Sequence, residues 1–327
     1  MDLFIKDALQ NLASPMIMFF ILGFLSTVIK SDIEIPQAIS KALAIYFMIA
    51  IGFKGGVEIS KNGLENGLFQ SILNSLIIGI TTPLISFLIL KYIGKIDNIN
   101  CGAISAHYGS VSVVTFVTAI AFLNIKSIQY SGYMAGMMAL MESPAIFVSI
   151  LLVRIFSSQK ISTLKSNYLD LLRESLFNSS IVLLFGSLVI GMIVGERGMM
   201  SVKPFLVEPF NGILTLFLLD MGMIAGQRIG EFKKVGLFLS LFAVFMPVLN
   251  ALSAIFLSSS FNLSKSDAFL FTVLAASSSY IAAPAAVRIA LPQANPAYYI
   301  TMSLAITFPF NIMFGIPIYF YLINNWF

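Results

Sequence analysis

Charged residues are scarce in this chain. Of 327 residues only 10% are Asp, Glu, Lys or Arg, whereas 58% are hydrophobic. About a quarter of the residues in a soluble domain are charged, so this chain lacks the polar groups to cover a globule of its size. A membrane-spanning helix needs roughly 20 mostly apolar residues. The composition therefore excludes an ordinary soluble protein and predicts an all-α integral membrane protein that crosses the bilayer many times.

Cysteine and histidine are nearly absent as well. The single Cys101 excludes a disulfide within the chain and a metal cluster built on cysteine. The single His107 cannot hold a metal alone, and we expect a packed, neutral imidazole there. The small net charge of +4 lies in loops and gives no reason to expect nucleic-acid binding.

Sequence motifs of enzymes are also missing. The chain contains no His-Glu-x-x-His zinc motif, no phosphate-binding loop and no Gly-x-Ser-x-Gly nucleophile motif. We therefore expect neither an enzyme nor an organic cofactor. The remaining enzymatic alternative is an intramembrane hydrolase or sensor that uses His107 and the serines of 277–279.

Long apolar runs, separated by charged residues, proline or glycine, predict ten membrane-spanning helices. Helices are required because backbone groups exposed to lipid must satisfy their own hydrogen bonds. The predicted spans are 13–29, 42–57, 68–90, 100–123, 131–153, 174–195, 205–225, 235–257, 268–290 and 297–322.

Lysine and arginine predict the orientation of these spans. Twelve of the 19 lie in the loops after odd-numbered spans, and the other seven lie on the opposite side. Cytoplasmic loops carry the excess of positive charge. We therefore expect a multi-pass protein of the plasma membrane, with loop 154–173 in the cytoplasm and both termini outside.

The two halves of the chain resemble each other. The pattern Gly-x-x-x-Gly-x-x-Ile at 52–59 recurs at 222–229, and the serines of 110–112 have a counterpart in 277–279. Each half holds five spans, an odd number, so the halves should lie upside down relative to each other. Inverted repeats of this kind are typical of secondary transporters.

The predicted repeats are 1–160 and 161–327. The simpler alternative is that each Gly-x-x-x-Gly motif only packs helices together. The recurrence of several features in the same order favours the repeat.

Spans 100–123 and 268–290 carry polar residues at their midpoints, and Pro284 predicts a helix break just before it. A broken helix presents backbone amides and positive dipole character at the start of its second half. Two such ends suit a small anion, and exposed carbonyl groups suit a cation such as Na⁺. The alternative is that these serines bond only to their own helices. The predicted anion-binding residues are Ser110, Val111, Ser112, Ser278, Ser279 and Tyr280.

Glu142 lies at the midpoint of span 131–153, where an ionisable group is costly and therefore a functional candidate. The alternative is a protonated side chain with a structural hydrogen bond. Asp220 lies nearer the end of its span, and Glu58 is expected to be solvated. The predicted cation-binding residues are Glu142, Ser143, Thr307 and Asn311.

Several stretches together resemble the sodium-dependent bicarbonate transporter family, and their spacing is kept along essentially the whole chain. They are Ile35-Pro36-Gln37-Ala38-Ile39-Ser40, Gly52-Phe53-Lys54-Gly55-Gly56, Met221-Gly222-Met223, Arg228-Ile229-Gly230-Glu231-Phe232-Lys233-Lys234-Val235, Ala275-Ala276-Ser277-Ser278-Ser279 and Pro292-Gln293-Ala294-Asn295-Pro296.

This resemblance implies ten helices in two inverted repeats, with a mobile core that carries substrate and a scaffold through which three subunits associate. It implies import of bicarbonate with Na⁺ by an elevator-like movement of the core. A sodium symporter for another organic anion, related to bile-acid carriers, is the alternative. Some family members are inhibited by a small PII-type signalling protein, but the short loop between the repeats argues against that regulation here.

The chain departs from the family pattern at the predicted site. Cyanobacterial members typically have an aspartate after the serines of the ninth span, where this chain has Tyr280, and an aspartate where Glu142 stands. Glu142 keeps the negative charge, whereas Tyr280 does not. The resemblance therefore supports the anion site more firmly than the details of ion coupling.

Overall fold

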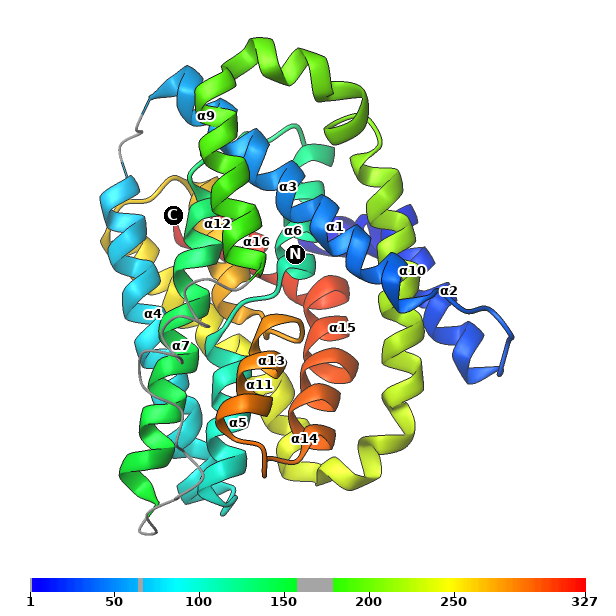
Figure 1. The fold of residues 1–327 in the computed structure, drawn as a ribbon, viewed down its shortest axis with the longest axis vertical. Coiled ribbons are helices and arrows are strands. Elements are labelled where there is room, and N and C mark those ends of the chain that lie inside the picture. The colour runs from blue at the N-terminus through cyan, green and yellow to red at the C-terminus, as the bar shows by residue number, and fades with distance from the viewer. Residues whose placement is uncertain (1, 64–66, 158–178) are drawn as a thin grey trace.

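The computed structural model describes residues 2–63, 67–157 and 179–327, and these residues form helices without strands (Figure 1). The expected all-α class is therefore confirmed for the described part of the chain. The boundary predicted between the two repeats, at residues 160 and 161, lies outside it. The helices are α1 (Asp2–Leu12), α2 (Pro15–Val28), α3 (Gln37–Asn62), α4 (Leu68–Leu88), α5 (Asn98–Gly109), α6 (Val113–Ile125), α7 (Met134–Phe156), α9 (Ser179–Leu206), α10 (Phe210–Arg228), α11 (Phe232–Ser260), α12 (Lys265–Ala276), α13 (Ala282–Ala290), α14 (Pro296–Thr301), α15 (Phe308–Phe310) and α16 (Ile316–Trp326).

Apolar helices long enough to cross a bilayer dominate the structure. The described residues contain eight of them, or nine when α1 and α2, bent by 57°, count as one span. The predicted span 268–290 is not among them, and it corresponds to the separate helices α12 and α13. A multi-pass membrane protein is thus confirmed, whereas the count of ten spans stays a prediction.

The closest helix pairs join the first half of the chain to the second. α3 packs along α9, and α2 packs along α10 (Figure 1). A Cβ atom placed on Gly56 would overlap the carbonyl oxygen of Leu188, and one placed on Gly222 would overlap that of Phe20. Backbones approach so closely only where the residue is glycine. Both Gly-x-x-x-Gly motifs therefore pack helices, and each does so between the two halves.

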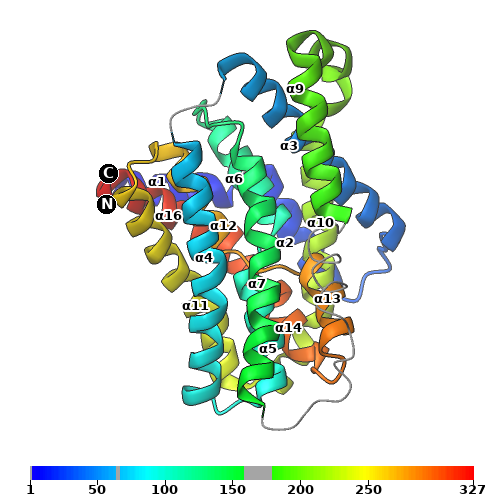
Figure 2. The ribbon, with the colours of Figure 1, turned by 60° about the vertical axis from the view of Figure 1, so that its left-hand side comes forward.

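The other helices form a second group, in which α4 lies against α5 and α7 and α11 lies against α12 (Figure 2). The exchange of partners between halves, α2 with α10 and α3 with α9, is the arrangement that an inverted repeat produces. The inversion of one half relative to the other stays a prediction.

The C-terminal helix runs from α14 to α16 through two π-helical segments, Met302–Thr307 and Asn311–Gly315. The wider turn of a π-helix changes which backbone groups find a partner within the helix. Asn11 of α1 donates its amide to the carbonyl oxygens of Ile312 and Met313, at 2.9 and 3.2 Å. The N-terminal helix is thereby fastened to the C-terminal one.

Candidate functional site

Two helices are broken where the sequence places its serines. α5 ends at Gly109 and α6 begins at Val113, and Ser110 and Ser112 between them have extended backbones. α12 ends at Ala276, and five residues separate it from α13. Both expected breaks are therefore present. Pro284 lies in the first turn of α13, where its missing N–H leaves no helical hydrogen bond unmade.

The two breaks cross and bond to each other. The N–H of Ser112 donates to the hydroxyl of Ser277 at 2.8 Å. The N–H of Ser279 donates to the carbonyl oxygen of His107 at 2.8 Å, and the Ser278 hydroxyl reaches the same oxygen at 3.2 Å. Helix ends leave backbone groups without intrahelical partners, and the crossing satisfies several of them between the two halves of the chain.

A small cavity of about 10 Å³ lies at this crossing. Its size corresponds to roughly one water molecule. The first residues of both half-helices, Val113 of α6 and Ala282 of α13, line it. The positive ends of two helix dipoles thus face one space, together with a carboxylate from α7. The lining residues are Val111, Ser112, Val113, Glu142, Ser180, Ser279, Tyr280, Ile281 and Ala282.

Four of the six predicted anion-binding residues line this cavity: Val111, Ser112, Ser279 and Tyr280. Ser110 lies beside it in the chain, with a hydroxyl that is buried and has no hydrogen-bond partner in the described structure. Ser278 instead shares a hydrogen bond of 2.7 Å with the hydroxyl of Ser303. The serines do not bond only to their own helices, because the bonds at the crossing join residues about 170 positions apart.

The predicted cation-binding residues are divided between two places. Glu142 is 3% exposed and lines the cavity, and Ser143 follows it in α7. Thr307 donates to the carbonyl oxygen of Ala243 at 2.6 Å, and its hydroxyl lies 2.7 Å from that of Tyr108.

Asn311 donates its amide to the carbonyl oxygen of Ala276 at 2.8 Å and accepts a hydrogen bond from Tyr319 at 2.9 Å. Ala276 is the last residue of α12. Thr307 and Asn311 therefore hold neighbouring helix segments in place, and neither lines the cavity.

His107 packs as expected from the sequence. Its ring stacks on that of Tyr299, with centroids 4.4 Å apart, and Nδ1 lies 2.7 Å from the carbonyl oxygen of Ala103. The described residues contain no group of three or more His, Cys, Asp or Glu side chains that could hold a metal ion. Glu142 is the acidic residue among the described residues that line the cavity at the crossing.

Asp267 is a buried acid that the sequence reading missed. Its carboxylate accepts bonds from the N–H and hydroxyl of Ser131, at 2.8 and 2.7 Å, and from the hydroxyl of Tyr133 at 3.1 Å. The available signal was the spacing Ser264-x-x-Asp267, which is typical of a helix start. Asp220 is also buried, at 3% exposed, so its position near the end of a span did not leave it in solvent.

The family of the chain follows from comparison with known proteins. The family model described as the Na⁺-dependent bicarbonate transporter superfamily matches residues 15–324, nearly the whole chain. The chain belongs to this superfamily, and the resemblance noted in its motifs is confirmed. No curated protein matches the sequence.

Proposed function

We propose that this member of the Na⁺-dependent bicarbonate transporter superfamily imports bicarbonate, driven by the Na⁺ gradient, through the crossing of its two broken helices. One observation carries the proposal: the first residues of α6 and α13 line a single cavity that Glu142 also lines. Helix starts favour an anion, and a carboxylate favours a cation. The same small space therefore offers complementary groups to both ions.

The groups at the crossing match the chemistry of bicarbonate. This anion has oxygen atoms that accept hydrogen bonds and one O–H that donates. Serine hydroxyls can do both, whereas backbone N–H groups only donate. Ser112 and Ser279 line the cavity, and Ser110 supplies a buried hydroxyl that bonds no other described residue. We assign anion binding to these three serines, with Val111, Ser278 and Tyr280 shaping the site around them.

Glu142 provides a physical reason for coupling to Na⁺. A carboxylate repels an anion placed in the same cavity, and this repulsion is strong where water is excluded. Na⁺ bound between them would remove it, so each ion raises the affinity for the other. Ser143 follows Glu142 as a further oxygen ligand, and Thr307 and Asn311 act through the helix segments that they hold.

Bicarbonate is larger than the 10 Å³ cavity. The site must therefore open when the ion enters and close around it afterwards. We infer that the group containing both breaks slides as a core against a scaffold that contains the glycine-packed pairs α2–α10 and α3–α9. Three copies of the chain would associate through the scaffold in the plasma membrane, with both termini outside.

Uptake of labelled bicarbonate into proteoliposomes, with and without an inward Na⁺ gradient, tests this proposal. We expect saturable uptake that needs Na⁺, and a KM for Na⁺ that rises at least tenfold in Glu142→Gln. Ser253→Ala is the control, because Ser253 is half-buried on α11, away from the crossing, and its hydroxyl donates to the carbonyl oxygen of Leu249 in its own helix. Uptake that is indifferent to Na⁺ would contradict the coupling. Uptake of labelled taurocholate in place of bicarbonate would favour the organic-anion alternative.

A further inference from the structure

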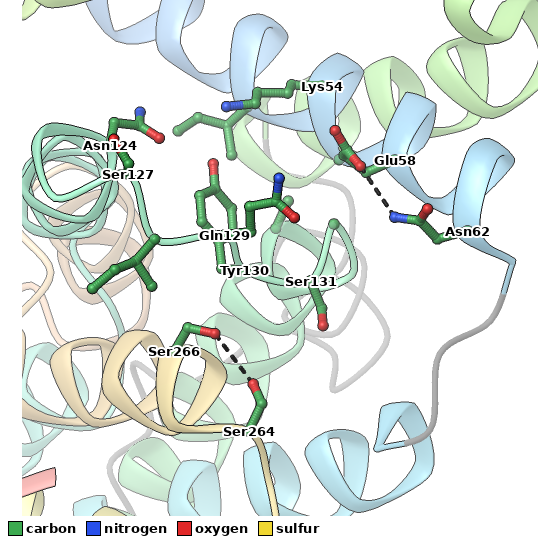
Figure 3. Close-up of a pocket in the computed structure, with 15 residues that line it drawn as sticks. Lys54, Glu58, Asn62, Asn124, Ser127, Gln129, Tyr130, Ser131, Ser264 and Ser266 are labelled. Carbon is green, nitrogen blue, oxygen red and sulfur yellow. Dashed lines mark hydrogen bonds between the residues drawn. The ribbon is translucent and has the colours of Figure 1, made fainter. Parts of the chain in front are cut away.

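A second and larger cavity, of about 540 Å³, lies away from the crossing. Its walls are the C-terminal half of α3, the segment 124–132 from the end of α6 toward α7, and the start of α12 (Figure 3). Ten polar residues line it, and they include Lys54, Glu58, Gln129, Tyr130, Ser131 and Ser264. In the predicted topology these segments all lie at the extracytoplasmic side. The transport site proposed above uses none of these residues.

One wall of this cavity is firmly held. Ser131 and Tyr133 donate to the buried carboxylate of Asp267, at distances between 2.7 and 3.1 Å. Bonds to a charged acceptor are stronger than those between neutral groups. The segment between α6 and α7 is therefore fixed to the start of α12, and the cavity keeps its shape.

Helix α7 connects this cavity to the crossing. Ala135 lines the large cavity, and Glu142 lines the small one. Seven residues make almost two helical turns, so both side chains lie on one face, roughly 10 Å apart along the helix. Met138 and Ala139 share that face between them, and they are 2% and 4% exposed. Two buried apolar residues of α7 thus lie between the lining of the large cavity and that of the proposed site.

Lys54 is the basic side chain among the described residues that line the large cavity. Its ammonium nitrogen lies 5.5 Å from the centre of the Tyr130 ring, and it forms no ion pair with the described residues. Glu58, one turn further out, accepts a hydrogen bond from Asn62 at 3.2 Å (Figure 3). A cationic group in a concave site with low-dielectric walls raises the local concentration of anions.

We propose that this cavity is the capture site for the incoming anion, and that Lys54 draws the anion in before it reaches the crossing. The inference rests on the proposed function, because it supplies the entry route to that site. Lys54 is a binding residue here, and Glu58 opposes it by repelling the same anion.

Substitutions at the two charges test this role through opposite effects on the KM for bicarbonate. We expect Lys54→Gln to raise the KM roughly fivefold to tenfold with a Vmax within about twofold of the wild type. Lys54→Arg keeps the charge and should stay near the wild-type KM, whereas Glu58→Gln should lower it. Lys61→Gln is the matched control, because Lys61 lies on the same helix but is exposed and pairs with Glu196 at 2.9 Å.

Chemical restoration of the charge separates attraction from packing. Cys101 is buried, so Lys54→Cys gives a variant with one accessible thiol. A cationic, membrane-impermeant methanethiosulfonate reagent, added from outside, should bring the raised KM back toward the wild-type value. An anionic reagent of similar size should raise it further. Identical effects of both reagents would overturn the proposal, since they would show a steric role.

The outcomes also distinguish this inference from the proposed function. Normal Na⁺-driven uptake in wild type together with a wild-type KM in Lys54→Gln would overturn the capture site and leave the transport function standing. An equal rise in KM for Lys54→Gln and Lys54→Arg would overturn it as well. Absence of bicarbonate uptake in the wild type itself would contradict the function and, with it, the capture site.

Discussion

The glycine-packed pairs and the crossing hold the two halves of the chain together by different means. In the pairs α3–α9 and α2–α10, the backbones touch because glycine replaces larger side chains. At the crossing, the backbones are extended and are joined by hydrogen bonds to serine. Lipid gives helices no hydrophobic drive to associate, so close packing must hold the first region together. The second region lacks regular helix, so its backbone groups and serine hydroxyls are available to bind ions.

This difference indicates how the work of a transporter is divided. Close packing of glycine leaves no space for a ligand and resists rearrangement. Irregular backbone inside a membrane protein is tolerated only where its polar groups find partners. A bound ion can serve as one of these partners. Substitutions should therefore damage the fold in the pairs and damage transport at the crossing.

The largest effect is expected in the glycine-packed pairs. Gly56→Leu would drive a side chain into the backbone of α9 at Leu188 and force the two helices apart. Overpacking typically costs about 1–3 kcal/mol, and occasionally more. An overlap with backbone that cannot move aside belongs to these larger cases. We expect no folded peak in size-exclusion chromatography of the detergent-solubilised variant.

Gly186→Leu is the matched control for this substitution. Gly186 lies on α9, in the same helix pair, but a Cβ atom there meets nothing within 4 Å. This variant should elute as the wild type does. Absence of the folded peak in both variants would show that leucine itself, rather than close contact between α3 and α9, prevents folding.

A smaller effect on stability is expected at the crossing. Ser277→Ala removes the hydroxyl that accepts the N–H of Ser112. A buried donor without a partner costs about 1–3 kcal/mol. The melting temperature of the solubilised protein should fall by several degrees, although the protein still folds. An unchanged melting temperature would contradict the view that this bond holds the two breaks together.

Ser110→Ala should reduce transport without changing the stability of the protein. The Ser110 hydroxyl is buried and bonds no described residue, so its removal breaks no hydrogen bond within the described part of the protein. We expect a melting temperature within about one degree of the wild type and bicarbonate uptake reduced roughly tenfold, as for a lost hydrogen bond of about 1.4 kcal/mol to the ligand. Wild-type uptake would assign the anion to other residues at the crossing.

The sequence predicted those features that follow from local chemistry. Apolar runs located the helices, and Pro284 with the serines located both breaks. Glu142 stood out because a charge at the centre of a span is rare, and the structure places it in the cavity. The repeated glycine motif indicated symmetry between the halves, which agrees with the exchange of helix partners.

Features that depend on distant contacts could not be predicted in the same way. Thr307 and Asn311 have the right chemistry for a cation, but their partners Ala243 and Ala276 come from other helices. Asp267 lies next to serine in a segment that resembles an ordinary helix start, and its burial comes from Ser131 and Tyr133 more than 130 residues away. The spacing of residues in a single sequence does not reveal which distant residues contact one another.

The smallest expected effect comes from a glycine that takes no part in helix packing. Gly212 lies in α10, the same helix as Gly222, but it is exposed and a Cβ atom there meets nothing within 4 Å. Alanine restricts the unfolded chain and favours helix, so Gly212→Ala should stabilise the protein by about 0.4–1 kcal/mol. A rise of one or two degrees in the melting temperature would agree with this. A fall would contradict it and show that another surface, such as a second copy of the chain, packs over Gly212.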